Sequence, residues 1–379
     1  MTTTVPELAI GLDLGDTHSQ VCVLDSRGKI TSRSKVATTP ESFEALFHSF
    51  AGKPVRLTIE VGAHSRWVQK LARRCGIEDL VVANPRKIAL ISQSLKKTDQ
   101  EDAYVLARSG QGLPEMLSPV EHSSDELYSD RALVESRALL VRTQSQLVTR
   151  IRSLVKTTGS RLPPCSADAF FRKAPEHIPP ILRGACAPLF EVLEKIHQQI
   201  AAIDKSIRQL VRKKYPIAAR LQEIPGVGPI VALSFVLTVQ DPGRFRTTRD
   251  IGAYLGLAPR KQQSGSSNPQ LGITKAGDSE MRRLLVLAAH CLLARGKDCA
   301  LKRWGKALSE RGGRSAKKRA IVALARKLAV AMLAIWKGNT PFDPWRGVPE
   351  SERPTSPPLQ LSATSARELR APATPAPEA

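Results

Sequence analysis

Four carboxylates in the first third of the chain have the residue types and positions of a divalent-metal site. Asp13 and Glu60 each stand where apolar residues alternate with others, the pattern of a strand with one buried face. Asp99 and Asp102 are three residues apart and share one face of the helix expected over residues 98–108. Together the four can hold a pair of Mg²⁺ ions, which prefer a few carboxylates and the oxygens of a bound phosphate. Two such ions stabilise the attacking and leaving oxygens when a phosphodiester is broken.

Both halves of this site also have simpler interpretations. Asp99 and Asp102 alone are typical of a solvated acidic first turn, which a helix N-terminus favours. An Asp-x-Gly strand such as residues 13–15 also opens the phosphate loop of sugar kinases and chaperone ATPases. That class needs a second phosphate loop and a Gly-Gly segment that binds adenosine, and neither is found after residue 110. A metal-dependent nuclease site of the RNase H and RuvC type is therefore favoured.

The strands and helices that would position these carboxylates alternate along the first 120 residues. Strands are expected at residues 10–14, 20–25, 29–36, 55–61 and 79–83, and helices at residues 64–75 and 98–108. Three consecutive strands followed by an α/β alternation imply a mixed sheet covered by helices. The fold class expected here is α/β, with a RuvC/RNase H-like mixed sheet.

The charge of the chain points to a polyanionic partner. Lys and Arg number 57 against 35 Asp and Glu, which gives a net charge of +22 and a pI near 10.1. Nucleic acid is the usual partner of so basic a protein. Binding to a membrane surface is less expected, because the basic residues are spread along the chain and do not flank an apolar anchor.

The sequence indicates neither export nor membrane insertion. The six cysteines form no CxxC pair, and no secretory signal precedes residue 10. The longest apolar run, residues 320–336, is interrupted by Arg326 and Lys327 and predicts a buried helix. A reduced, cytoplasmic setting is therefore expected, with no membrane partner and no structural zinc.

From residue 125 the apolar pattern changes to heptads. Val134, Val141, Val148 and Val155 recur every seven residues. Residues 189–210 then show the alternating spacing of four and three that is typical of a coiled-coil seam. A Pro-rich turn separates the two runs. Two long helices are expected, which either form an arm for oligomerisation or pack together within one subunit, and the spacing fits both.

A glycine-rich corner follows the heptads. Residues 225–228 read Pro-Gly-Val-Gly between two helical runs, the pattern of a helix-hairpin-helix. Gly226 and Gly228 would let backbone amides approach a phosphate without an intervening side chain. A tight corner between two packed helices is the alternative.

A serine stands in a basic, Gly-flanked loop further on. Ser264 precedes Gly265, and the cations around it are Arg260, Lys261, Lys275, Arg282 and Arg283. A serine hydroxyl is a weak nucleophile unless a base, a metal or dense positive charge lies beside it. From the residues alone, a flexible basic loop that only holds the DNA backbone is the favoured interpretation.

Two blocks of the sequence resemble insertion-sequence family 110 transposases. The first block comprises residues 11–15, Glu60 and residues 97–103. The second comprises residues 224–228, 256–260, Ser264-Gly265, 273–278 and 281–283. The resemblance spans roughly residues 8–340, with both blocks in the family's order.

The resemblance implies a composite site. It assigns Asp13, Glu60, Asp99 and Asp102 as metal ligands, with Mg²⁺ as cofactor and two ions expected, and Ser264 as nucleophile. Ser266 and Ser267 are close enough in sequence to be alternatives for the nucleophile. Asp16 departs from the family pattern, in which a basic or small residue is common at this place.

The resemblance also implies partners and an order of domains. The partners are donor and target DNA, a non-coding guide RNA that pairs with both, and further copies of the chain in a dimer or tetramer, acting at the nucleoid of a prokaryotic cell. The expected domains are residues 1–120, RuvC-like; 121–215, coiled-coil arm; 216–340, helical transposase domain with the helix-hairpin-helix; and 341–379, a disordered Pro-rich tail.

The expected function is therefore that of a transposase or recombinase that cuts and rejoins DNA. Two alternatives remain: a RuvC-like junction-resolving endonuclease that acts by hydrolysis, and a basic scaffold that binds nucleic acid without catalysis. Because aromatic residues make up only 4% of the chain, base stacking cannot supply much sequence recognition. A guide strand would supply it by base pairing.

Overall fold

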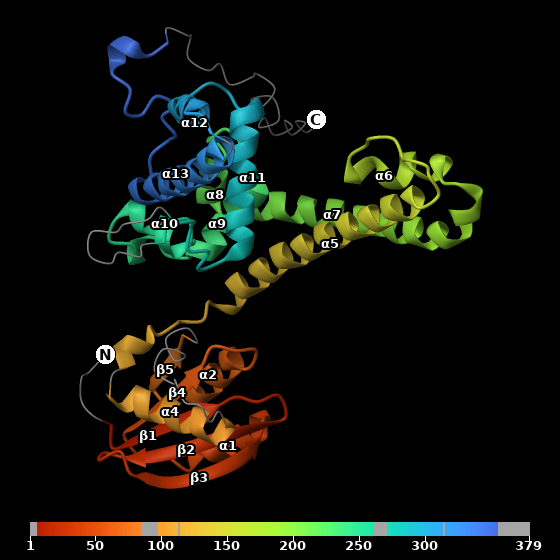
Figure 1. Cartoon of the computed structure of the whole chain (residues 1–379). Coiled ribbons are helices and arrows are strands. Elements are labelled where there is room, and N and C mark those ends of the chain that lie inside the picture. Colours follow the sequence, from red (N-terminus) through yellow and green to blue (C-terminus); the bar gives the residue numbers. More distant parts are fainter. Residues whose placement is uncertain (1–5, 85–97, 113, 261–270, 314, 355–379) are drawn as a thin grey trace, which may run out of the picture. The chain divides into compact units, whose positions relative to one another are not determined.

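The computed structural model describes residues 6–84, 98–112, 114–260, 271–313 and 315–354 (Figure 1). The chain divides into two compact units, Met1–Ser124 and Asp125–Ala379. Each unit is described below by itself.

The first unit is built on a five-stranded mixed sheet. Its strands are β1 (Leu8–Asp13), β2 (His18–Asp25), β3 (Ile30–Ala37), β4 (Val55–Glu60) and β5 (Asp79–Ala83), in the order β3-β2-β1-β4-β5. β1, β2 and β3 pair antiparallel, while β4 is parallel to both β1 and β5. The five strands predicted from the sequence are confirmed to within about two residues, and so is the mixed sheet.

Helices cover both faces of this sheet. Alternate strand residues such as Ile10 and Leu57 pack with Phe43 of α1 (Pro40–His48) and Leu71 of α2 (Ser65–Arg74). On the other face, Ala9 packs against α4 (Asp99–Gly112). A short 3₁₀ turn, Pro114–Leu117, follows α4. Residues that alternate along β1 and β4 therefore belong to two different cores.

The second unit is helical in its described part. Its helices are α5 (Asp125–Lys156), α6 (Ala167–Lys173), α7 (Arg183–Lys213), α8 (Pro216–Leu221), α9 (Pro229–Val239), α10 (Ile251–Tyr254), α11 (Ser279–Arg295), α12 (Ala300–Glu310) and α13 (Ala316–Gly338). Short 3₁₀ turns lie at Pro175–His177, Pro180–Leu182, Pro242–Arg244, Thr248–Asp250 and Glu350–Glu352. Within the described segments, no helix combines the length and apolarity that crossing a membrane requires.

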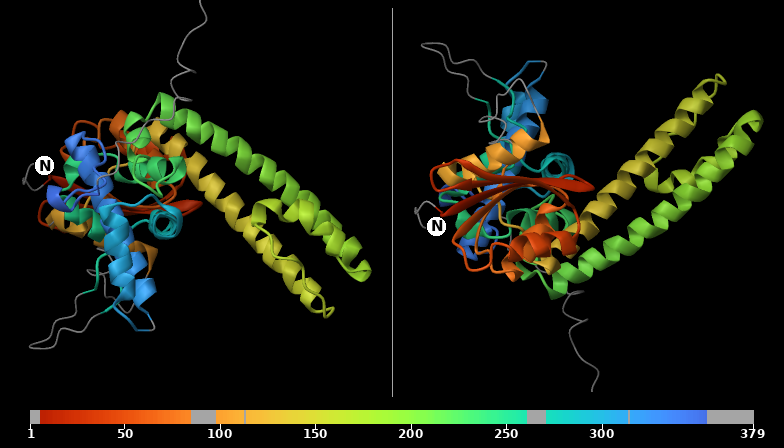
Figure 2. Two further views of the ribbon diagram at one scale, coloured as in Figure 1. Left: turned by 90° about the horizontal axis from the view of Figure 1, so that it is seen from above. Right: turned by 90° about the horizontal axis from the view of Figure 1, so that it is seen from below.

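The two heptad-bearing helices, α5 and α7, lie side by side and form an arm (Figure 2). At the base of the arm, Val134 and Ile207 join the large core of the second unit, which also contains helix α9, buried from Val231 to Val239. At its tip, Ile151 and Leu193 belong to a separate core closed by Phe170 of α6. The helices thus pack together within one subunit, and the structure leaves oligomerisation through the arm as a prediction.

Candidate active site

Helix α4 approaches β1 unusually closely, and a glycine permits this. A methyl group at Gly11 would lie 2.0 Å from the carbonyl oxygen of Ala103 and 2.4 Å from the amide nitrogen of Ala107. No side chain fits at such distances, so the backbone of α4 rests directly on the backbone of β1. Gly11 alternates with Ala9 and Asp13 along the strand, which places Asp13 on the α4 face of the sheet.

The far end of α4 fixes the direction in which the helix runs. Arg56 Nη1 donates to the carbonyl oxygen of Gly110 at 3.2 Å, and Gln111 Nε2 donates to that of Asp25 at 2.7 Å. Asp25 pairs with Leu8, the first residue of β1. The C-terminal end of α4 therefore lies where β1 and β4 begin, and its N-terminal turn lies where these two strands end.

Asp13 and Glu60 are neighbours at that edge of the sheet. The parallel pairing of β1 with β4 runs to Leu12 opposite Ile59, and Asp13 and Glu60 are the next residue on each strand. Neighbouring strands are about 4.8 Å apart. Both carboxylates alternate with residues that contact α4, and both side chains are half-buried.

The first turn of α4 brings the other two predicted ligands to the same edge. Asp99 is one helical turn before Ala103, which rests on Gly11, so it lies on the stripe above β1. Asp102 is one turn before Leu106, which packs with Val81 of β5. Asp99 is exposed and Asp102 half-buried. The backbone thus directs two carboxylates from strands and two from a helix toward the same edge of the sheet.

The donor set suits a hard cation such as Mg²⁺, since it offers only carboxylate oxygens. Its side chains are not drawn together into a finished site, because the described part of the chain contains no group of three His, Cys, Asp or Glu side chains placed to hold a metal. The backbone supplies the arrangement, and rotation of exposed and half-buried side chains would have to complete it.

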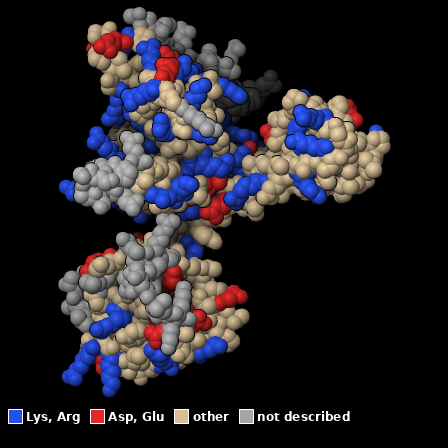
Figure 3. Space-filling model, viewed as in Figure 1, with Lys and Arg blue, Asp and Glu red and all other residues tan. Residues whose placement is uncertain are grey.

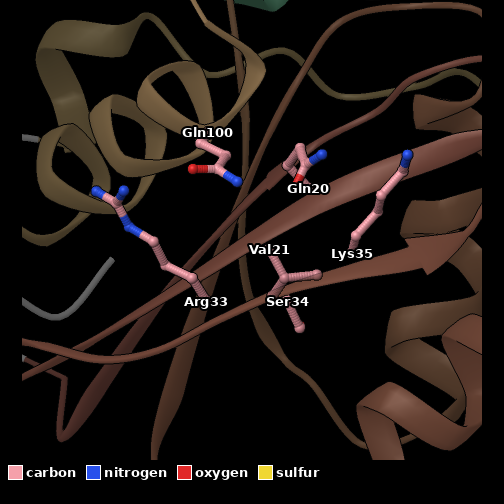
Figure 4. A pocket seen from close by; sticks show the side chains of 6 residues that line it. All are labelled: Gln20, Val21, Arg33, Ser34, Lys35 and Gln100. Atoms are coloured by element: carbon pink, nitrogen blue, oxygen red, sulfur yellow. The ribbon is translucent and has the colours of Figure 1, made fainter.

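A cavity of about 230 Å³ adjoins this edge (Figure 4). Gln20, which pairs with Asp13, lines it together with Gln100 in the first turn of α4. Arg33 and Lys35 of β3 extend to the same side of the sheet, and Arg33 forms an ion pair with Glu101 at 3.6 Å. Lys35 is exposed and would offset the negative charge of an approaching phosphate.

Gly11→Ala tests the packing that holds α4 on β1. We expect it to destabilise the first unit by about 1–3 kcal/mol, because the added methyl group overpacks backbone against backbone. The displaced helix should also carry Asp99 and Asp102 away from Asp13 and lower DNA cleavage. Thermal denaturation and a cleavage assay measure the two effects.

The matched control for this variant is Gly112→Ala at the other end of α4. A methyl group there would have no atom within 4 Å, so stability should stay the same or rise slightly. Equal melting temperatures for Gly11→Ala and Gly112→Ala would contradict the close contact.

The serine loop is the segment 261–270 that contains Ser264, and backbone hydrogen bonds join the residues on either side of it. Arg260 N donates to Gly272 O and Thr274 N donates to Ala258 O, each at 2.9 Å. The chain therefore enters and leaves residues 261–270 at neighbouring points. The predicted nucleophile and its possible substitutes lie outside the described residues, as does one predicted cation: Ser264, Ser266, Ser267 and Lys261.

Arg282 holds the base of this loop together. Its Nη1 donates to the carbonyl oxygens of Leu255 at 3.1 Å, Ala276 at 2.6 Å and Gly277 at 3.2 Å. These carbonyls belong to two backbone segments in close contact, since a methyl group at Gly277 would be 2.1 Å from Tyr254 O. The structure thus gives Arg282 a supporting position, whereas the sequence predicted a nucleic-acid contact.

The other predicted cations differ in their partners. Arg283 binds both carboxylate oxygens of Glu280, and these hydrogen bonds hold the pKa of Glu280 below its usual range. Arg260 and Lys275 are exposed, and no carboxylate among the described residues pairs with either. Arg260 and Lys275 are therefore more available to a phosphate than Arg282 and Arg283, which already bind groups of the protein.

The two glycines of the helical corner also differ. A methyl group at Gly226 would lie 2.6 Å from Ala288 O, so this glycine lets the corner pack on α11. Gly228 has no atom within 4 Å of that position and precedes α9, whose N-terminus has no side-chain cap. The corner therefore has a packing role at Gly226, and an open helix N-terminus at Gly228.

The arm carries a basic stretch that the sequence analysis did not single out. Residues 136–167 contain six Lys and Arg and no Asp or Glu. Two of the six are used internally: Arg137 pairs with Asp204, and Arg152 donates to Pro163 O at 3.3 Å. The other cations are exposed, namely Arg142, Arg150, Lys156 and Arg161. The absence of acidic residues over so long a stretch was the available signal, and Figure 3 shows basic side chains on this arm.

Comparison with known proteins gives the family. A model for DEDD transposases of IS110 matches residues 10–159, and one described as "Transposase IS116/IS110/IS902 family" matches residues 218–305. The first match contains the carboxylate edge, and the second contains the helical corner, the serine loop and α11.

Curated relatives include two transposases that are similar over most of their length and a gene-inverting protein that is similar over part of it. The transposase for insertion sequence element IS1111A of Coxiella burnetii is 29% identical over 86% of this chain and 88% of its own. A probable family 20 transposase of Pseudomonas aeruginosa is 26% identical over 88% of this chain and 98% of its own. The pilin gene-inverting protein of Moraxella lacunata is 31% identical, over 38% of this chain and 45% of its own. The chain belongs to the IS110 family of transposases and is a DNA transposase.

Proposed function

We propose that the chain cuts DNA with metal ions held by the carboxylates of its first unit. The cut DNA phosphate is then held as a phosphoester of a serine in its second unit until the strands are rejoined. The observation that carries the first half is the direction of α4. Its N-terminal turn lies where β1 and β4 end, so Asp99 and Asp102 share an edge of the sheet with Asp13 and Glu60. The five-stranded mixed sheet covered by helices is consistent with the RuvC/RNase H-like domain expected for residues 1–120, which supports the same assignment.

The four carboxylates would hold two Mg²⁺ ions. When bound, the ions would stabilise the attacking and leaving oxygens of the phosphodiester. The half-buried Asp13 and Glu60 would form the fixed part of the site, since each ends a strand in the middle of the sheet. Asp99 and Asp102, on the first turn of a helix, would close around them.

Ser264 is the proposed nucleophile. Its Oγ would attack phosphorus as its proton leaves, and one bond from phosphorus to a sugar oxygen would break as that oxygen gains a proton. The reverse reaction with a hydroxyl of another strand would rejoin DNA without loss of bond energy to water. Exposed Arg260 and Lys275 flank the loop and would offset the charge of the transition state.

Recognition of DNA sequence is assigned to a guide RNA. The net charge of +22 and the exposed cations of the arm suit binding of phosphate backbones, which carry no sequence information. We assign residues 121–215 to the arm and 216–340 to the transposase domain. We further propose that the active species is a homo-oligomer.

Analysis of reaction products tests this function against its alternatives. The protein is purified with its bound nucleic acid, which is sequenced to identify the guide and its matching DNA. Labelled donor and target DNA are then incubated with the complex and Mg²⁺. We expect rejoined strands, and their loss after ribonuclease treatment. Free ends would instead indicate a hydrolytic junction nuclease, and unchanged DNA a non-enzymatic scaffold.

A further inference from the structure

A histidine and an aspartate lie opposite each other in the two loops that follow the strand carboxylates. Asp16 lies three residues after Asp13, and His64 lies four residues after Glu60. His64 Nε2 is 3.7 Å from Asp16 Oδ1. The pair therefore stands beside the carboxylate edge of the sheet, and neither residue was given a role by the sequence.

A tryptophan determines which nitrogen of His64 carries the proton. Trp67 Nε1 donates to His64 Nδ1 at 3.1 Å. An indole nitrogen can only donate, so Nδ1 must present its lone pair, and the proton of the neutral ring must be on Nε2. The two rings are at 89° to each other, an orientation that allows the indole N–H to point at the in-plane lone pair of Nδ1.

The tryptophan is itself held by the core. Its ring stacks on that of Phe43, with centroids 5.4 Å apart, and Phe43 is completely buried. The buried Phe43 thus fixes Trp67, and Trp67 in turn fixes the orientation of the imidazole ring of His64. The Nε2–H group of His64 is left as a fixed donor on the outer side of the ring.

This donor faces an anionic oxygen without being bonded to it. A distance of 3.7 Å to Asp16 Oδ1 is too long for a hydrogen bond, and no other described residue accepts from Nε2. The Asp16 side chain is 99% exposed, whereas that of His64 is only 27% exposed. The aspartate can swing into solvent, and the histidine cannot readily move.

We propose that His64 is a phosphate-positioning residue. Its Nε2–H donates to a non-bridging oxygen of the nucleic-acid backbone beside the phosphate that is cut, and this oxygen takes the place that the Asp16 carboxylate has in the free protein. Trp67 acts through His64, by fixing the tautomer. This role rests on the proposed function, because it requires a phosphodiester at the carboxylate edge.

Two amide variants separate this role from simple packing. The amide nitrogen of glutamine reaches the position of histidine Nε2, while that of asparagine reaches only the position of Nδ1. His64→Gln should therefore keep the donor, and His64→Asn should place it toward Trp67. Trp67→Phe keeps the stack on Phe43 but removes the indole N–H.

The experiment is nuclear magnetic resonance on the full chain with ¹⁵N-labelled histidine rings and tryptophan indoles. The probe is a thymidine dinucleotide phosphodiester with Ca²⁺ in place of Mg²⁺, and its affinity is read from the Trp67 indole signal. In the native chain we expect the proton of His64 on Nε2 and a shift of that signal on adding the probe. His64→Gln should bind within about threefold of the native chain and His64→Asn at least about tenfold more weakly. Trp67→Phe should show both tautomers.

Two results would overturn the assignment: a proton on Nδ1 in the native chain, or equal affinities of His64→Gln and His64→Asn. Asp13→Asn serves to separate this outcome from failure of the proposed function. It should leave the His64 tautomer unchanged while DNA cleavage is lost. If Asp13→Asn cleaves normally, the carboxylate mechanism fails, whatever His64 shows.

Discussion

Asp13→Asn should reduce DNA strand cleavage by at least about 10³-fold while leaving the first unit folded. The side chain keeps its size but loses the charge that a divalent cation requires, and it stands beside Glu60 at the end of a central strand. Glu60→Gln should have an effect of the same order. Cleavage is measured with labelled DNA on the complex that retains its bound nucleic acid, and folding by thermal denaturation.

The melting temperature supplies an independent measurement. Mg²⁺ should raise it in the native chain, because a ligand that binds only the folded state stabilises that state. The increase should disappear in Asp13→Asn and Glu60→Gln. Glu44→Gln is the matched control, since Glu44 is an exposed carboxylate of α1, the helix on the opposite face of the sheet. Retention of more than about a tenth of native cleavage by Asp13→Asn would rule out its role as an essential ligand.

Ser264→Ala should abolish a covalent protein–DNA adduct and leave binding of nucleic acid and Mg²⁺ intact. The reason is chemical: rejoining strands without an external energy source needs an intermediate that preserves the phosphoester bond. The two ends of the segment that contains this serine are held together by the hydrogen bond from Arg260 N to Gly272 O. Denaturing electrophoresis of cleavage mixtures with labelled DNA detects the adduct as a slowly migrating band.

Ser266→Ala and Ser267→Ala are the controls for this prediction. Both should still form the adduct. A band that survives Ser264→Ala and vanishes in one of these variants would move the assignment to that residue. If the active native chain formed no adduct at all, the hydrolytic nuclease would become the better explanation.

The sheet could be predicted from sequence because its information is local. β1 and β4 alternate apolar residues with others, β5 is a short apolar run, and glycines or turns separate the strands. Helix α1 was not predicted, although Thr39 caps it and Pro40 begins it, because only Phe43 and Phe47 of its nine residues are buried.

The arrangement around the carboxylates depends on contacts between distant residues. The direction of α4 follows from two contacts: the backbone of Ala103 rests on Gly11, and Gln111 donates a hydrogen bond to Asp25. The residues of each pair are more than 80 positions apart, so no local sequence pattern indicates that they meet. The position of Arg282 has the same origin, since its carbonyl partners include Leu255, which is 27 residues away. Residue types therefore indicated the chemistry. The structure was needed to separate the exposed cations that are free to meet a phosphate from Arg282, which binds backbone carbonyls.

The arm has two cores, one at its base and one at its tip, and this has a consequence for how such proteins can diverge. Val134 and Ile207 belong to the basal core, whereas Ile151 and Leu193 belong to the distal one. Adding seven residues to both α5 and α7 would lengthen the arm by about 10.5 Å and preserve the faces that pack. The arm thus behaves as an adjustable spacer, whose length can evolve in whole heptads while the structures at both ends stay unchanged.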